Sequence, residues 1–365
     1  MRVAIDITSL LKPRLSGIGV YERALIRSLA ELDSESRYDL CYRLSRRRSR
    51  EFLPPPPGPN FSFRWSIPVL SRFGFSGTDV YHGPDGRIPS VRGPAFVATI
   101  HDIASVISDG FSPAGFRRKK RAYYRHCIRK ASAIITPSRS VKDDLVVHLG
   151  ASADRIKVIP MAPNDGLGLV DPDQVQAVLR KYGVGGRYIL TVGPLSIRKN
   201  TAALVRAFAS ARQQLGSDTW LVIIGRHVQP DETLRTISES GCADRIVSVQ
   251  YVSDHELSAF YTGAHAFAFP SLYEGFGMPP IEAMTFGVPV VAADTASIPE
   301  TVGDAALLID PQDPNELSEA LARVCDNEEE RDRLVRAGHE HVKRFSWDRT
   351  VGETLDLYRS VANGH

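Results

Sequence analysis

The sequence predicts an α/β protein in which two doubly wound domains face each other across a central cleft. Short apolar segments alternate with amphipathic segments along nearly the whole chain, and this alternation is typical of parallel strands joined by helices. The alternation is interrupted between Pro163 and Gly186 and then resumes. A length of 365 residues also suits two domains of medium size better than one. Because ligands of such sheets bind at the carboxyl ends of the strands, we expect the site in the cleft.

The first domain is expected over residues 1–165 and begins with a strand at Arg2–Ile7. The loop LLKPRLSGIG follows, and apolar residues at helical spacing then predict a helix from about Val20 to Leu32. Pro54–Pro59, which includes four consecutive prolines, is expected to be an extended loop. Further strands are expected at Tyr38–Leu44, Asp79–His82, Phe96–Ile100, Ala133–Thr136 and Lys157–Ile159.

A linker is expected at residues 166–186 and the second domain at residues 187–347. RYILTVG predicts the first strand of this domain, and Asn200 is expected to cap the helix TAALVRAFASARQQL. Asp313 opens DPNELSEAL, a helix start with a capping acid, a proline and a second acid. DHELSAFY predicts another helix, and the remaining strands are expected at WLVIIG, RIVSVQ, AFAFPS, VPVVAA and AALLID.

Composition predicts a folded protein without a membrane span. Hydrophobic residues make up 43% of the chain and charged residues 24%. No apolar run reaches about 18 residues, and no basic region followed by an apolar stretch opens the chain, so we expect neither a transmembrane helix nor a cleaved signal. The four cysteines are far apart and form no CxxC motif, which favours reduced thiols over a zinc site or a disulfide framework.

Positive charge is concentrated in two segments, although the net charge is only +3. From Phe111 to Lys142 the chain has ten lysines and arginines and no aspartate or glutamate. Ser45–Arg50 is a second basic run. Each segment is consistent either with an ordinary solvated surface or with a binding surface for an anionic partner.

Two motifs at strand ends of the first domain have a functional and a structural interpretation. Ser16-Gly17-Ile18-Gly19 lies between the first strand and a helix, where glycines let backbone N–H groups approach a phosphate, but on its own the motif is explained better by a tight turn. His101-Asp102 ends the strand FVATI, where a titratable pair is well placed for chemistry. Alternatively, His101 is simply hydrogen bonded to the neighbouring carboxylate.

Arg198-Lys199-Asn200 lies between the strand YILTVG and the next helix. Basic residues are unfavourable at a helix N-terminus unless an anion is present, because they oppose the helix dipole. A guanidinium, an ammonium and a helix N-terminus in one loop would suit a diphosphate leaving group without a metal ion. This segment is therefore a candidate anion site.

The stretch PSLYEGFGMPPIEAM places Glu274 and Glu282 eight positions apart. AFAFPS predicts a buried strand before it, and a proline predicts a helix start within it, with Glu282 in the first turn. Both carboxylates would then lie at one opening, together with N–H groups of the helix. Carboxylates accept hydrogen bonds from paired hydroxyls, so the two acids are suited to hold sugar rings.

Asp171-Pro172-Asp173 matches the DxD motif that binds a metal–diphosphate in other sugar transferases. Here the motif precedes the amphipathic segment QVQAVLRKYG within the expected linker, so helix capping explains it better. We therefore predict no metal site.

SLYEGFGMPPIEAM resembles the E-x7-E signature of retaining glycosyltransferases of family 4, which have the GT-B fold of two Rossmann-like domains. SGIGVY, IHD, TPSRSVKDDL, RKN and YVSDHEL follow in the order of that family, so the resemblance covers nearly the full chain. It implies an enzyme that transfers a sugar from a nucleotide-sugar donor and needs no other cofactor. It also implies that a last helix, residues 348–365, packs back on the first domain.

The resemblance implies a role for each matching residue. Glu274 would hold hydroxyls of the donor sugar and Glu282 those of the ribose. Arg198 and Lys199 would bind the diphosphate and stabilise it as it leaves, and His101 would lie beside the sugar. The other donor-binding positions that it implies are Gly17, Gly19, Val252, Phe276 and Gly277.

Within the family, SGIG-Y together with IHD looks most like bacterial GDP-mannose-dependent mannosyltransferases of O-antigen or exopolysaccharide synthesis. We expect metal-independent transfer with retention to a lipid-linked or oligosaccharide acceptor. VIPMAPN and Ile197 depart from the family pattern and leave a UDP- or dTDP-sugar donor open. An epimerase or phosphorylase of the same fold is a rival enzyme, and a non-catalytic glycan- or nucleic-acid-binding protein is a rival of another class.

The basic segment FRRKKRAYYRHCIRKA predicts a helix with Phe116, Tyr123, Tyr124 and Ile128 on one side. Such a helix can lie on an anionic membrane. We therefore expect peripheral contact with the inner face of the cytoplasmic membrane through Arg46–Arg50 and Arg117–Lys130. A nucleic-acid partner is not expected, because no stacking or helix-turn-helix signature accompanies the basic run.

Overall fold

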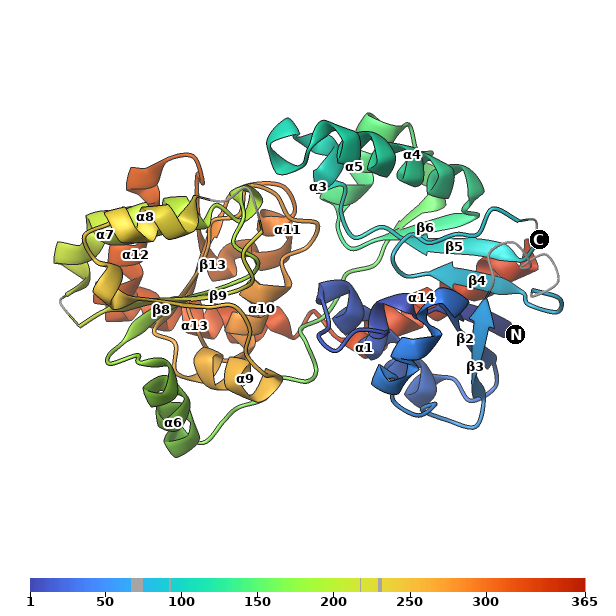
Figure 1. The fold of residues 1–365 in the computed structure, drawn as a ribbon, viewed down its shortest axis with the longest axis horizontal. Coiled ribbons are helices and arrows are strands. Elements are labelled where there is room, and N and C mark those ends of the chain that lie inside the picture. Colours follow the sequence, from blue (N-terminus) through green and yellow to red (C-terminus); the bar gives the residue numbers. More distant parts are fainter. Residues whose placement is uncertain (67–74, 92, 217, 229–231, 365) are drawn as a thin grey trace. The chain divides into compact units, whose positions relative to one another are not determined.

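The computed structural model describes residues 1–66, 75–91, 93–216, 218–228 and 232–364. The chain forms two compact units, and in each of them Figure 1 shows a sheet with helices packed against it. Unit 1 comprises residues 1–162 and 345–365, and unit 2 comprises residues 163–344. Each unit contains a fully parallel sheet, so the expectation of two doubly wound domains is confirmed.

Unit 1 has a seven-stranded sheet in the order β3-β2-β1-β4-β5-β6-β7. The order reverses between β1 and β4, which makes their carboxyl ends the switch point where such sheets bind ligands. The edge strand β3 and the preceding 3₁₀ helix η2 (Leu44–Phe52) were not among the expected elements. The strands are β1 (Arg2–Asp6), β2 (Arg37–Arg43), β3 (Phe61–Ser66), β4 (Val80–Gly83), β5 (Ala95–Thr99), β6 (Ala133–Thr136) and β7 (Ile156–Val158).

Helices cover both faces of this sheet (Figure 1). One face packs on α4 and α5, whose apolar residues join the strands in a single core. The other face packs on α1 and α14, which also contact each other. The helices of unit 1 are α1 (Gly17–Leu32), α3 (Ala104–Ile107), α4 (Ala114–Lys130), α5 (Arg139–Leu149) and α14 (Trp347–Asn363).

A buried chain of hydrogen bonds ties the C-terminal helix α14 to the first sheet. The Tyr358 hydroxyl lies 2.6 Å from Nδ1 of His82, and Nε2 of His82 lies 2.8 Å from Oγ1 of Thr99. That hydroxyl in turn lies 3.2 Å from the hydroxyl of Tyr21 in α1. Burial, with a smaller effect of His101, lowers the pKa of His82 to about 3, so the ring is neutral and each nitrogen has a partner.

Unit 2 has a six-stranded sheet in the order β10-β9-β8-β11-β12-β13, which reverses between β8 and β11. Its strands are β8 (Tyr188–Val192), β9 (Trp220–Ile224), β10 (Ile246–Val249), β11 (Ala266–Phe269), β12 (Val290–Ala293) and β13 (Ala306–Ile309). Its helices are α6 (Pro172–Tyr182), α7 (Thr201–Leu215), α8 (Thr233–Glu239), α9 (Asp254–Thr262), α10 (Met278–Thr285), α11 (Ile298–Val302), α12 (Pro314–Asp326) and α13 (Glu328–Val342).

Residues 166–186, expected as a linker, belong to unit 2 in the structure. Their helix α6 contacts α9, because Nζ of Lys181 lies 2.5 Å from Oε1 of Glu256 and the Tyr182 hydroxyl donates to the same oxygen. Asp171 immediately precedes α6, but its side chain makes no capping hydrogen bond. The DxD motif therefore lies at the start of a helix, as expected, but the Asp171 side chain does not cap that helix.

Of the two residues expected to cap helices, Asp313 does so through its side chain and Asn200 does not. Asp313 accepts hydrogen bonds from the N–H groups of Asn315 and Glu316, as a capping residue should. Asn200 precedes α7, but its side chain does not cap the helix. Its backbone is left-handed, with φ of 55°, and its side-chain amide instead donates to the carbonyl of Pro311.

A buried acidic side chain, Glu22, lies close to Asp6 at the switch point of the first sheet. Asp6 ends β1, and the Arg87 guanidinium lies 3.7 Å from it and 2.6 Å from Asp85. Glu22 in α1 is only 1% exposed, and its carboxyl group interacts with the Ser9 side chain and with the charges of Asp6 and Arg87. Burial, and then Asp6, raise the pKa of Glu22 well above its usual value, so the folded protein favours the neutral acid.

Replacing this acid by its neutral isostere, Glu22→Gln, should stabilise the protein increasingly as pH rises. Above about pH 4.5 the unfolded chain has lost the proton that folded Glu22 keeps, so wild-type stability falls with pH by up to about 1.4 kcal/mol per unit. Denaturant unfolding at several pH values measures this difference. Glu31→Gln, an exposed glutamate of the same helix paired with Arg27, is the control. A pH-independent difference for Glu22→Gln would contradict burial of the neutral acid.

Candidate active site

Two basic side chains converge on one carboxylate at the switch point of the second sheet. Arg198 and Lys199 belong to a 3₁₀ turn after β8, η5 (Ile197–Lys199), and Glu274 lies in the loop after β11. Nη1 of Arg198 lies 2.8 Å from Oε1 of Glu274, and Nζ of Lys199 lies 2.7 Å from the same oxygen. The structure therefore brings together three predicted catalytic residues from two separate loops.

The electrostatics of this cluster favour an anion. Burial alone would raise the pKa of Glu274, but Lys199 and Arg198 together outweigh it and lower the value to about 2. Lys199 also lies 4.4 Å from the centre of the Phe269 ring, and its side chain is only 10% exposed. Two cations against one carboxylate leave an excess positive charge in a partly desolvated place, which suits a bound diphosphate.

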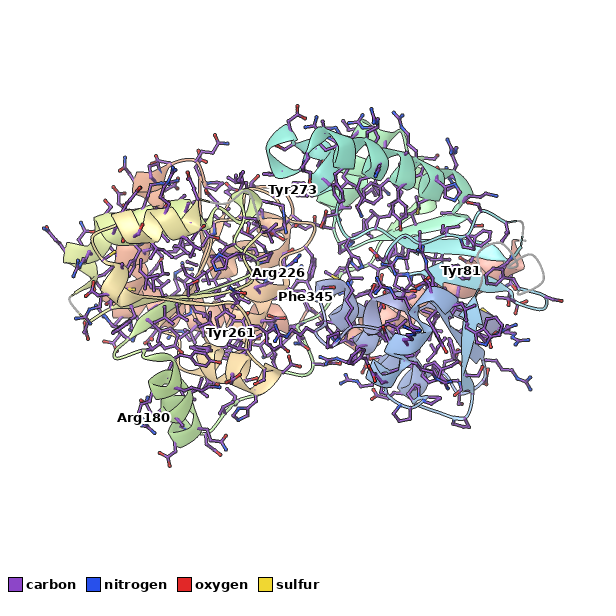
Figure 2. All side chains as sticks on the ribbon, viewed as in Figure 1. Tyr81, Arg180, Arg226, Tyr261, Tyr273 and Phe345 are labelled. Carbon is purple, nitrogen blue, oxygen red and sulfur yellow. The ribbon has the colours of Figure 1, made fainter. Side chains whose placement is uncertain are left out.

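The main chain joins the two loops as well. The amide of Leu272 donates to the carbonyl of Arg198 at 2.8 Å, and Nη1 of Arg198 donates to the carbonyl of Tyr273 at 2.7 Å. Figure 2 labels Tyr273 on unit 2, together with Tyr261 of α9. The guanidinium is thus held by the loop that also carries Glu274, so its position depends on that loop.

The second glutamate has a different environment from the first. Glu282 accepts a hydrogen bond of 2.9 Å from the Tyr261 hydroxyl and interacts with the main chain of Asn164. Burial, the largest effect, nevertheless raises the pKa of Glu282 to about 7. Glu274 is therefore ionised at neutral pH, whereas Glu282 keeps its proton more readily than an ordinary glutamate. Tyr261 and Asn164 were missed in the sequence because neither belongs to the motif.

The helix that carries Glu282 starts one residue earlier than its prolines. It begins at Met278, so Glu282 is its fifth residue and the expectation of a first-turn position was wrong. Pro279 and Pro280 have no N–H, so this helix end offers fewer donors to an anion than expected. Gly277 precedes the helix with φ of 110°, a conformation that a side chain would strain.

Val252 and Phe276 are both buried near these loops of unit 2. Val252 lies between β10 and α9, directly before Ser253, the residue that caps α9. Ser253 accepts a hydrogen bond from the Glu256 amide, and the Glu256 carboxylate accepts one from the Ser253 amide, which closes a capping box. This box fixes the backbone beside Val252 at the carboxyl edge of the sheet.

The other predicted residues lie on unit 1. Gly17 is the first residue of α1, and a Cβ at Gly19 would lie 3.0 Å from the Leu15 side chain. The ring of His101 contacts the edge of Tyr21, a residue of the same helix, with 4.8 Å between centroids. The glycine segment and His101 therefore lie close together within this unit.

His101 is not hydrogen bonded to its sequence neighbour. Its Nε2 lies 2.8 Å from the carbonyl of Pro84, while Asp102 accepts from the amide of Ala104. The alternative interpretation, in which His101 is hydrogen bonded to the carboxylate of Asp102, was therefore wrong. Burial lowers the pKa of His101, which favours the neutral ring with Nε2 as the donor to Pro84.

Among the described residues, no group of three or more histidines, cysteines, aspartates or glutamates is placed to hold a metal ion.

Because the charges are buried, Lys199 and Glu274 should be energetically coupled in the ligand-free protein. A double-mutant cycle of Lys199→Met and Glu274→Gln should give a favourable coupling of about 1–3 kcal/mol in unfolding experiments. The more exposed pair of Lys181 and Glu256 has a similar distance and provides the matched cycle, which should give a smaller coupling because water screens it. Equal couplings for the two pairs would contradict this description of the site.

Comparison with known proteins assigns both units to glycosyltransferases. Residues 16–162 match the model of Glycosyltransferase Family 4, and residues 180–341 match that of Glycosyl transferases group 1. The chain is 30% identical to O-antigen chain mannosyltransferase B of Escherichia coli over 282 residues. This alignment covers 77% of the chain and 74% of that relative.

Solved structures support the fold. Sucrose-phosphate synthase of Thermosynechococcus elongatus matches over all of both chains, with a TM-score of 0.77 and 20% identity. HepE of Anabaena, solved with UDP and glucose, matches 98% of this chain and 99% of its own, with a TM-score of 0.75 and 18% identity. This chain therefore belongs to glycosyltransferase family 4, with the GT-B fold, and is a hexosyltransferase.

Proposed function

We propose that this enzyme transfers mannose from GDP-mannose to a lipid-linked or oligosaccharide acceptor in the synthesis of a cell-surface polysaccharide. The observation that carries the proposal is the cluster of Arg198, Lys199 and Glu274 at the switch point of the second sheet. It supplies positive charge for a diphosphate beside a carboxylate for sugar hydroxyls. The similarity to an O-antigen mannosyltransferase supports mannose as the sugar.

In this proposal the two cations stabilise the leaving group. As the bond between the anomeric carbon and the phosphate oxygen breaks, negative charge develops on the diphosphate, and Arg198 and Lys199 are already in place to bind it. Since they are held by Glu274 and by the loop carbonyl of Tyr273, little reorganisation is needed. Turnover then requires no metal ion.

We further propose retention of the anomeric configuration by attack on the face that the diphosphate leaves. The acceptor oxygen bonds to the anomeric carbon, and its proton passes to the departing phosphate oxygen. Glu274 is a poor candidate for a covalent nucleophile, because two cations hold its charge and lower its pKa to about 2. Its proposed task is to hold donor-sugar hydroxyls, while Glu282 holds the ribose.

The first unit contributes His101 and the glycine segment in this proposal. His101 would lie beside the sugar at the reaction centre, and Gly17 and Gly19 would let the start of α1 approach the donor. The buried contact of His101 with Tyr21 fixes the histidine relative to that helix start. Val252, Phe276 and Gly277 complete the proposed donor site on the second unit.

A UDP- or dTDP-sugar is the alternative donor. The solved HepE structure contains UDP and glucose, so nucleotides other than GDP occur in enzymes of this fold. A thermal-shift screen with GDP, UDP, dTDP and their sugars decides between them, because a ligand of the folded state raises the unfolding temperature. The largest shift with GDP and GDP-mannose is expected, and a larger shift with another nucleotide would overturn the donor assignment.

Arg198→Ala and Lys199→Ala should each lower turnover of the preferred donor by about 100- to 1000-fold, the usual effect of losing one stabilising donor group. Release of the nucleoside diphosphate, with excess chelator present, measures this effect. Arg206→Ala, an exposed arginine in α7 of the same unit, is the control and should retain turnover. Near-normal rates in the two site variants would refute the leaving-group role, and a requirement for magnesium would refute metal independence.

We also propose that unit 1 binds the anionic inner face of the cytoplasmic membrane, but through charge rather than through an apolar helix face. Tyr124, Cys127 and Ile128 of α4 are buried in the core, so the expected apolar side is not available. Phe116 is 47% exposed, and several cations of α4 face solvent, namely Arg118, Lys119, Arg121, Arg125 and Arg129.

The second basic run also presents cations to solvent. Arg46, Arg48 and Arg50 are exposed in η2, and the side chain of Arg47 lies outside the described residues. The guanidinium of Arg50 lies 5.8 Å from the centre of the Phe63 ring. In the described part of the chain, every helix is too short or too polar to span a bilayer.

The double variant Arg118→Glu and Arg121→Glu should reduce sedimentation with vesicles of phosphatidylglycerol and phosphatidylcholine. Each basic residue near an anionic surface contributes about 1 kcal/mol, so partitioning should fall by about tenfold or more. Arg180→Glu with Arg344→Glu, two exposed arginines of unit 2, is the matched control. Equal binding by both double variants, or equal binding to phosphatidylcholine alone, would contradict the proposal.

A further inference from the structure

Two buried hydroxyls hold the backbone of the loop that joins Glu274 to α10. Oγ of Ser297 lies 2.9 Å from the carbonyl oxygen of Glu274 and 3.0 Å from that of Phe276. Oγ1 of Thr301 donates to the same Phe276 carbonyl at 2.6 Å. Ser297 is fully buried and Thr301 nearly so. These hydroxyls therefore fix two alternate carbonyls of a four-residue loop.

Because the peptide bond is planar, holding these two carbonyls also sets the direction of the N–H groups that follow them. In a trans peptide the C=O of one residue and the N–H of the next point in opposite directions. With the Glu274 and Phe276 carbonyls directed at Ser297 and Thr301, the N–H groups of Gly275 and Gly277 are directed away from these hydroxyls. The loop thus directs these two carbonyls toward the start of α11 and the N–H groups of Gly275 and Gly277 to the opposite side.

The element that carries the hydroxyls is itself firmly held. Nε2 of His341, in α13, donates to the carbonyl of Thr301 at 2.7 Å. A Cβ at Gly303 would lie only 2.9 Å from the His341 ring, so the glycine permits this approach. The position of Thr301 is therefore determined by a third segment.

Backbone strain accompanies this arrangement. Ala296, directly before Ser297, has φ of 52°. Within the described part of the chain, Ala296 and Asn200 are the residues other than glycine with positive φ. Asn200 directly follows Arg198 and Lys199, so both strained positions adjoin the candidate site. A left-handed alanine costs about 1 kcal/mol or more, and such conformations persist where the surrounding contacts impose them.

We infer that Ser297 and Thr301 are positioning residues that aim the N–H groups of Gly275 and Gly277 at the phosphate and sugar of the donor. The inference rests on the proposed function, in which the diphosphate binds at Arg198 and Lys199. These two N–H groups take the place of the donors that the start of α10 lacks, since Pro279 and Pro280 have no N–H. The inference also adds Gly275 to the backbone donors and assigns roles to two residues that lie 23 and 25 positions from their partners.

Removing one hydroxyl at constant shape tests the inference. Thr301→Val and Ser297→Ala should each lower kcat for the preferred nucleotide sugar by about 10- to 100-fold, because a small misplacement of a donor weakens the transition state more than the ground state. Thr301→Ser keeps the hydroxyl and should restore most of the rate. Binding of the nucleoside alone should be unchanged in all three variants.

Thr354→Val is the matched control, because Thr354 is an equally buried threonine of unit 1 whose hydroxyl donates to the carbonyl of Thr350 at 2.7 Å. It loses a hydrogen bond of the same kind and should retain kcat. A loss of rate in Thr354→Val equal to that in Thr301→Val would mean that a general loss of stability explains both, which would overturn the inference.

Amide hydrogen exchange in the nucleotide-free protein gives a readout that does not depend on activity. Thr301→Val and Ser297→Ala should increase exchange in residues 274–278, and Thr301→Ser should not. Unchanged exchange, or unchanged kcat in an active enzyme, would overturn the positioning role while the proposed function stands. Absence of turnover with every nucleotide sugar in the wild-type protein would refute the proposed function, and the exchange data would still decide whether the hydroxyls fix the loop.

Discussion

The contact of Glu274 with Arg198 and Lys199 is the interaction on which the organisation of the candidate site depends. Two like charges would repel each other in a partly buried place, and the carboxylate between them makes their approach favourable. The contact also joins the loops after β8 and β11, the two strands at which the order of the sheet reverses. The proposed anion site is therefore assembled in the ligand-free protein.

This preorganisation has a cost that the surrounding structure must offset. Glu274 and Glu282 are both buried, and both flank a loop that needs left-handed backbone at Gly277. Ala296 adds strain on the neighbouring segment. Strain and buried charge gather around one loop, while the rest of the sheet is regular, which is the distribution expected of a functional site.

Much of the fold follows from local patterns, and the strands with continuous apolar segments were placed within about two residues, the usual uncertainty of element ends. The edge strand β3 was missed, because Arg64 and two serines interrupt its apolar pattern. The packing of α6 was missed because it depends on Lys181 and Tyr182 meeting Glu256, which lies more than seventy positions away. Long-range polar contacts leave no periodic signal in a sequence.

The same limit applies to the site. Motif spacing identified Arg198, Lys199 and Glu274 as candidate site residues, and the structure places them in contact. Spacing could not indicate that Tyr261 would donate to Glu282, because isolated hydroxyl residues occur throughout the chain. Motif spacing also could not show that the two glutamates differ in pKa. The pKa values of about 2 for Glu274 and about 7 for Glu282 reflect different neighbours rather than different residue types.

Calorimetric titration with the preferred nucleoside diphosphate and the matching monophosphate, in excess chelator, tests the central claim most directly. If Arg198 and Lys199 form a metal-free diphosphate site, the wild-type protein binds the diphosphate more tightly than the monophosphate. Arg198→Ala and Lys199→Ala then lose this preference by about tenfold each, as expected for a charge-assisted hydrogen bond. Equal affinity for both nucleotides in the wild-type protein, or a preference that survives in both variants, would contradict the account.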